Sequence, residues 1–173
     1  MRPFRHLLSI LLLPFVVAAV VPRWLVVAWA GVDTRWASGP GPAWLARAAG
    51  AALLLLGLAL VAWCVALFAR VGQGTLAPWD PTRRLVAVGP YRHVRNPMIG
   101  GVAAMLAGEA LLTGSRVLAG WAVGVVLLNH VYFLLSEEPG LVRRFGSDYL
   151  AYRAAVPRWI PRITPWRGPV DAP

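Results

Sequence analysis

The sequence contains no lysine, and only seven of its 173 residues are acidic. A soluble domain of this size exposes much of its chain to water and needs far more polar surface than 14% charged residues provide. With 58% hydrophobic residues, the chain is typical of an integral membrane protein that forms one compact bundle. The absence of lysine also favours a GC-rich bacterial source, so we expect the protein in the bacterial cytoplasmic membrane.

Cysteine is nearly absent too. The only one, Cys64, lies inside an apolar run, and a single cysteine excludes a disulfide framework. The three histidines, His6, His93 and His130, do not have the spacing of metal ligands, and we expect no metal site. The formal charge of +10 comes from arginine alone. These arginines are spread over loops, which argues against nucleic-acid binding and is typical of cytoplasmic loops that contact anionic lipid.

Four apolar runs predict an all-α integral membrane protein with about four transmembrane helices. The first run follows Arg2 and Arg5, and its length favours a retained anchor over a cleaved signal peptide. The second is longer than the roughly 20 residues that a bilayer requires. The last two are joined closely enough to form a helical hairpin. The runs are residues 7–30, 43–69, 97–112 and 117–135.

Small residues are frequent in both helices of the hairpin. They are Gly100, Gly101, Ala104 and Gly108 on the first helix, and Gly120 and Gly124 on the second. Because small residues let helix backbones approach closely in lipid, we expect the two helices to pack tightly against each other. The Gly120 and Gly124 face could instead serve a dimer, and the oligomeric state stays open.

The segment after Pro139 is less apolar and predicts an amphipathic helix that lies on the membrane or caps the bundle. Its apolar residues recur at helical spacing: Leu141, Phe145, Tyr149, Tyr152 and Val156. A proline-rich tail follows from Pro157 and is expected to have little regular structure beyond Arg162. Most tryptophans, Trp166 among them, stand near the ends of apolar runs, where they are expected to anchor the chain at the membrane surface.

The chain is expected to form a single membrane domain, residues 1–173. Within it, residues 1–69 hold two N-terminal spans, residues 70–161 the functional core, and residues 162–173 the tail. Arginines concentrate in the N-terminus, the long connection of residues 70–96 and the C-terminal region. The positive-inside rule therefore places both termini in the cytoplasm, together with the polar segments next to the hairpin.

Two polar clusters border the hairpin and are the candidate site. The first is Gly-Pro-Tyr-Arg-His-Val-Arg-Asn-Pro-Met, residues 89–98, and the second is Ser-Glu-Glu-Pro, residues 136–139. Ionisable residues at the edge of a span are costly to bury, so two such clusters indicate one shared site. Pro97 suits the first turn of a helix, whose unpaired N–H groups can receive a carboxylate or a ribose oxygen. The alternative is that Arg95, Asn96 and Pro97 form only a helix cap with an interfacial arginine.

In order and separated by a hairpin, these clusters resemble the isoprenylcysteine carboxyl methyltransferase family, to which the phospholipid N-methyltransferases are related. The second cluster continues as Glu-Glu-Pro-x-Leu-x-x-x-Phe-Gly-x-x-Tyr-x-x-Tyr-x-x-x-Val-Pro-Arg, and the resemblance covers about residues 78–161. It implies S-adenosylmethionine as the cofactor, held between the hairpin and the C-terminal segment. The implied cofactor-binding residues are Leu85, Val86, Gly89, Tyr91, Arg95, Asn96, Pro97, Met98, Ile99, Glu137 and Glu138. The family pattern aligns its cofactor-contacting glutamate with Glu137, and either glutamate could accept a strong bond from the cofactor.

Polar residues inside the hairpin are candidates for contact with a lipophilic acceptor. Glu109, Asn129 and His130 lie within apolar runs, where ionisable residues are functional candidates. Glu109 and His130 could alternatively pair with each other across the hairpin. Phe133 is the fourth candidate. The resemblance implies this, because eukaryotic enzymes of that family carry a substrate-contacting arginine at the position four residues before the glutamate that aligns with Glu137. No residue is assigned a catalytic role.

Three positions depart from the family pattern. Ile99 replaces a tyrosine common among relatives, and Asn96 replaces a histidine of the eukaryotic enzymes, which removes a titratable ring. Phe133 in place of arginine weakens the case for a prenylated-cysteine carboxylate as acceptor. Carboxylates, amines and hydroxyls of lipids or isoprenoids stay open. The alternative function is a non-catalytic scaffold or transporter subunit, with Glu109 and His130 as an ion relay.

Overall fold

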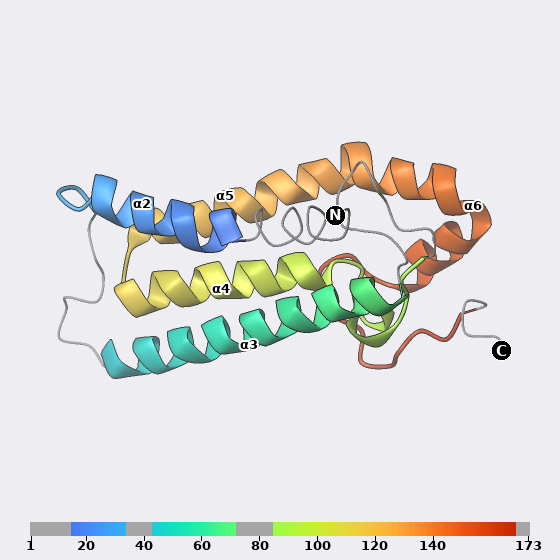
Figure 1. The fold of residues 1–173 in the computed structure, drawn as a ribbon, viewed down its shortest axis with the longest axis horizontal. Coiled ribbons are helices and arrows are strands. Elements are labelled where there is room, and N and C mark those ends of the chain that lie inside the picture. The colour runs from blue at the N-terminus through green and yellow to red at the C-terminus, as the bar shows by residue number, and fades with distance from the viewer. Residues whose placement is uncertain (1–14, 34–42, 72–84, 169–173) are drawn as a thin grey trace, which may run out of the picture.

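The computed structural model describes residues 15–33, 43–71 and 85–168, and within these ranges it is helical and contains no strand (Figure 1). The expected all-α class is therefore confirmed for the described part of the chain. In order, the elements are η1 (Val16–Val20), α2 (Val21–Ala28), α3 (Ala43–Val71), η3 (Gly89–Arg92), α4 (Pro97–Thr113), α5 (Arg116–Tyr132), η4 (Phe133–Glu137) and α6 (Glu138–Ala155).

Two stretches are long and apolar enough to cross a membrane, Ala43–Phe68 and Arg116–Ala155. The apolar helices Val16–Ala28 and Pro97–Thr113 are shorter, so the expected number of four spans stays a prediction. The described part of the first apolar run begins with the π-helical turn η1 and continues directly into α2. Its residues 7–14 lie outside the described part of the chain.

Helices α3 and α4 lie side by side and make backbone contact through two pairs of glycines (Figure 1). A Cβ atom on Gly57 would lie 2.5 Å from the carbonyl oxygen of Gly101, and one on Gly108 would lie 2.6 Å from that of Gly50. Only hydrogen fits at such distances. In both helices the two glycines are about two turns apart, so the pairs coincide when the helices run antiparallel.

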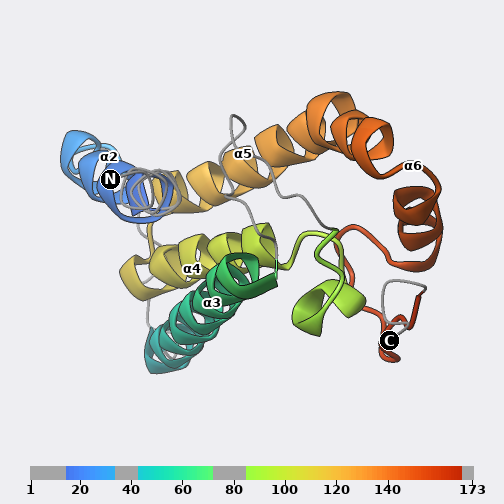
Figure 2. The ribbon, with the colours of Figure 1, turned by 45° about the vertical axis from the view of Figure 1, so that its right-hand side comes forward.

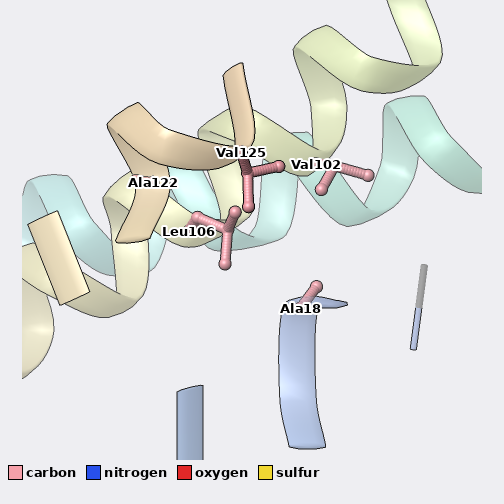
Figure 3. Close-up of a cluster of buried hydrophobic side chains, with 5 residues drawn as sticks. All are labelled: Ala18, Val102, Leu106, Ala122 and Val125. Atoms are coloured by element: carbon pink, nitrogen blue, oxygen red, sulfur yellow. The ribbon is translucent and has the colours of Figure 1, made fainter. Parts of the chain in front are cut away.

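The expected close packing of the α4–α5 hairpin through glycine is wrong. A Cβ atom added to Gly120 or Gly124 of α5 would have no neighbouring atom within 4 Å, and the same holds for Gly100 of α4. The small-residue face of α4 is already occupied by α3. Instead, α4 contacts α5 and η1 through a cluster of buried apolar side chains, which are Ala18, Val102, Leu106, Ala122 and Val125 (Figure 3).

A polar contact fixes the turn between α4 and α5. Helix α4 ends at Thr113 and is followed by its C-cap Gly114, whose φ of 67° is left-handed, and Ser115 caps α5 by accepting a bond from the Leu118 N–H at 3.1 Å. The carboxylate of Asp33 accepts bonds from the Ser115 hydroxyl and from the Arg116 N–H at 3.1 Å. An acidic group at a helix N-terminus is favourable, and this one ties the end of the α2 segment to the hairpin.

Helix α5 continues without a break through the π-helical turn η4 into α6, and α6 then bends sharply at Gly146 (Figure 2). Gly146 has φ 52° and ψ −126°, which interrupts the expected single amphipathic helix. The apolar stripe packs inward on Ala87 and Trp166, so α6 caps the bundle and does not lay this face on the membrane. Trp166 is therefore not a surface anchor, since it is buried with its ring 5.2 Å from that of Tyr152.

Candidate functional site

The first polar cluster forms a loop that returns the chain from α3 to α4. Gly89 begins the short helix η3 with a φ of 57°, and a Cβ atom there would lie 2.9 Å from Cδ1 of Leu67 on α3. Both the left-handed backbone and the close approach require glycine at this position. Gly89 therefore shapes the loop, and its contact with a ligand stays a prediction.

Three of the predicted cofactor-binding residues pack their side chains against α3. Val86, Tyr91 and Met98 form a buried cluster with Cys64, and the Tyr91 ring meets Phe68 edge-on at 5.5 Å. Burial raises the pKa of the Tyr91 phenol well above its ordinary value, so the hydroxyl stays protonated. These side chains hold the loop in place, and contact with a ligand remains a prediction for them.

Helix α4 begins at Pro97 as expected, and Asn96 stands at its N-cap position, as the helix-cap alternative has it, whereas Arg95 is not interfacial. The Asn96 side chain makes no capping hydrogen bond to the helix, and its carbonyl accepts the first bond from the Gly100 N–H at 3.0 Å. Arg95 points away from solvent, with a side chain only 11% exposed. The helix start therefore keeps N–H groups that its own cap residue does not satisfy. Leu85 and Ile99, at either end of the loop, are half-buried.

The two polar clusters meet at Glu138. Arg95 of the first cluster donates to Oε1 of Glu138 at 2.6 Å across 43 residues of sequence. Arg158 donates to the same oxygen from Nε at 2.8 Å, its Nη2 also lies 2.8 Å from that oxygen, and Nε of Arg153 lies 3.8 Å from Oε2. Glu138 is 5% exposed, so its charge is compensated inside the protein instead of by water.

Glu137 differs from its neighbour although the two are adjacent. It ends the π-helical turn η4 and is half-buried, and among the described residues no donor or cation pairs with its carboxylate. Adjacent residues of a helix point in directions about 100° apart, so the two carboxylates face different surroundings. Glu138 thus has arginine partners within the described fold that Glu137 does not have.

The four candidate contacts for the acceptor do not form one group. Glu109 and His130 do not pair, because α4 and α5 are antiparallel and place them toward opposite ends of the hairpin. Glu109 lies about 18 Å along α4 from Pro97 at 1.5 Å per residue. One of its carboxylate oxygens is buried without a hydrogen-bond partner.

The other three candidates lie at the end of the hairpin that carries the polar clusters. The Asn129 amide donates to the Val125 carbonyl of its own helix at 2.8 Å. His130 accepts a bond at Nδ1 from the Trp159 indole at 3.0 Å, and the buried Phe133 ring lies 5.8 Å from that indole. His130 and Phe133 lie a few residues before Glu137 on the same continuous helix, whereas Glu109 lies near the other end of the hairpin.

Sequence reasoning missed three residues of this region, namely Arg153, Arg158 and Trp159. Arg158 belongs to the Val-Pro-Arg end of the second motif, which was a usable signal. Trp159 stands in a proline-rich stretch without periodicity, and nothing in its local pattern indicates a long-range partner. Among the described residues, no cluster of histidine, cysteine or acidic side chains could hold a metal ion.

Comparison with known proteins identifies one family. A family model of the phospholipid methyltransferases matches residues 45–148, which is more than half of the chain. The matched segment runs from the start of α3 to the bend region of α6 and contains both polar clusters. No curated protein and no solved structure matches the chain.

Proposed function

The chain belongs to the phospholipid methyltransferase family, related to the isoprenylcysteine carboxyl methyltransferase-like membrane enzymes, and on that premise we propose that it methylates a lipophilic acceptor with S-adenosylmethionine. Membership supports a membrane methyltransferase in general. The cofactor, the acceptor class and the cytoplasmic position of the site are our proposals.

The observation that carries the cofactor proposal is the carboxylate of Glu137. It is half-buried at the junction of the two polar clusters, and no described residue pairs with it. A desolvated carboxylate without a partner is costly, and a ligand ammonium or hydroxyl would satisfy it. S-adenosylmethionine carries both groups, so the residues present fit this cofactor.

The start of α4 supplies a second, complementary group. Asn96 leaves the first N–H groups of the helix without a side-chain cap, and the positive end of the helix dipole lies there. Such an end favours a carboxylate or a ribose oxygen. We propose that Asn96, Pro97, Met98 and Ile99 bind the cofactor through this helix start, while Leu85, Val86, Gly89 and Tyr91 frame it and Arg95 fixes Glu138.

The acceptor is proposed to enter from the bilayer beside the C-terminal end of α5. Bound at the site, the cofactor supplies an activated methyl group, and the protein has to align the acceptor with it and exclude water. At this level His130 is half-buried and offers one polar group, while the Phe133 ring is buried behind the surface. A carboxylate acceptor would need no base, whereas an amine or hydroxyl would have to lose a proton.

Calorimetric titration of the detergent-purified protein with S-adenosylhomocysteine tests the cofactor proposal. We expect the parent to bind, and Glu137→Gln to bind about ten- to a hundredfold more weakly, the range for one charge-assisted hydrogen bond. Asp148→Asn is the matched control, because Asp148 is an exposed acidic residue on α6 and should leave binding unchanged. Absence of binding by the parent would refute the proposal and favour a non-catalytic scaffold.

A further inference from the structure

The tail after α6 returns along the first polar cluster instead of leaving the protein (Figure 2). The Arg95 N–H donates to the Pro157 carbonyl at 2.9 Å, and the Arg162 N–H donates to the His93 carbonyl at 2.9 Å. Nδ1 of His93 lies 2.8 Å from the Arg162 carbonyl and completes the pairing. The tail is thus bound to the loop that precedes α4, although it forms no helix or strand there.

Two tail residues between these bonds reach the other half of the site. Arg158 binds Glu138, which directly follows the π-helical turn η4. Trp159 donates to His130, which precedes that turn, and its indole packs on Phe133 at the start of the turn. Residues 157–162 therefore connect the loop before α4 with both ends of the turn that carries Glu137.

The bond to His130 has a defined direction. An indole N–H can only donate, so Nδ1 of His130 must accept, and the ring proton is assigned to Nε2. The pair thus holds the imidazole in one tautomer and one orientation. A π-helical turn inside an α-helix is rare and is frequently found at a functional site. Here Arg158 and Trp159 are the tail residues that hold it.

We propose that residues 157–162 set the spacing between the two halves of the cofactor site, with Arg158 and Trp159 as positioning residues for Glu137. This inference rests on the proposed function and adds to it a segment outside the family match, which ends at residue 148. Without these contacts η4 can relax toward a regular α-helix, which would rotate Glu137 relative to the start of α4.

The test compares affinity for S-adenosylhomocysteine with the midpoint of thermal unfolding in the full-length protein. Trp159→Phe keeps an aromatic ring and removes the N–H, and we expect binding to weaken roughly five- to tenfold, the effect of one hydrogen bond. Arg158→Gln should weaken binding by at least as much. The controls are Trp44→Phe, an exposed residue of α3, and Arg167→Gln, an exposed residue of the tail, and both should bind as the parent does.

A rescue variant separates positioning from general stabilisation. His130→Asn keeps an acceptor close to the place of Nδ1 and should retain most of the affinity, whereas His130→Leu should lose as much as Trp159→Phe. Combining His130→Leu with Trp159→Phe should cost no more than either change alone, because both remove the same bond.

Binding of the parent together with unchanged affinity in Trp159→Phe and Arg158→Gln would overturn the positioning role and leave the proposed function intact. The same role is overturned if affinity falls only in proportion to a lower unfolding midpoint. Absence of binding in the parent itself would refute the proposed function, and the inference with it.

Discussion

Replacing Glu138 by glutamine separates its structural role from the binding role that we assign to Glu137. The change keeps the shape of the side chain but removes the charge that faces Arg95 and Arg158, whose side chains are 11% and 17% exposed. Breaking one partner of a buried ion pair costs about 3–5 kcal/mol, since the remaining charges stay desolvated. Arg153 adds little, because it is 49% exposed and 3.8 Å away.

A loss of about 3 kcal/mol lowers the unfolding midpoint of a chain of this length by roughly 6–12 °C. The protein provides its own reporter, because Cys64 is its only cysteine and is fully buried in the folded state. A thiol-reactive fluorescent dye added during a temperature ramp in detergent therefore reports the opening of the core. Cys64 of the Glu138→Gln variant should react with the dye at a lower temperature than Cys64 of the parent.

Glu137→Gln is the matched control for this measurement. Since no described residue pairs with Glu137, its neutral variant should unfold at or above the temperature of the parent and lose affinity for S-adenosylhomocysteine. The reverse pattern would refute the assignment: a Glu138→Gln protein that unfolds like the parent but no longer binds would make Glu138 the ligand group.

Three further predictions concern the bundle, each measured as the unfolding midpoint with the same dye. Gly57→Ala should destabilise by about 1–3 kcal/mol, because its Cβ atom would meet the Gly101 carbonyl at 2.5 Å, while Gly124→Ala should be neutral. Asp33→Asn should cost about 0.5–2 kcal/mol through the weaker cap on α5, and an unchanged midpoint would exclude that role. Trp166→Ala should cost about 3–5 kcal/mol, and a surface anchor would cost far less.

Local sequence signals predicted where most helices begin and end. They did not predict which helices and which side chains contact each other. Pro97 stands at the start of α4 and Gly114 directly after its end, as proline and glycine commonly do at helix ends, so the hairpin was predictable. The glycines of α4 were also visible, but a small-residue face packs equally well on any helix that offers another. The partner of α4 is decided by Gly50 and Gly57 on α3, whose spacing matches that of the α4 glycines. Such a match between two distant segments is not visible in either segment alone.

The candidate site shows the same limit. The meeting of the two polar clusters was predictable from the cost of exposing ionisable groups to lipid. Which of Glu137 and Glu138 pairs with the arginines was not predictable, because sequence spacing does not reveal which side of a helical turn faces them. The tail was missed because Arg158 and Trp159 bind partners 20 and 29 residues away, and because its backbone bonds to the loop leave little trace in a sequence.

The scarcity of acidic residues makes their positions informative. Lipid tails are as apolar as leucine, so burial of apolar side chains does little to hold helices together in a membrane, and specific polar contacts have to contribute. Within the described residues, Asp33 provides such a contact at one end of the bundle and Glu138 at the other, with the glycine contacts of α3 and α4 between them. Asp148 is exposed to solvent. Glu109 and Glu137 are the two half-buried carboxylates of the described chain without a structural partner, and only Glu137 stands where both polar clusters meet. Because Glu137 has no partner in the described part of the fold at this position, it is the carboxylate that we propose to bind the ligand.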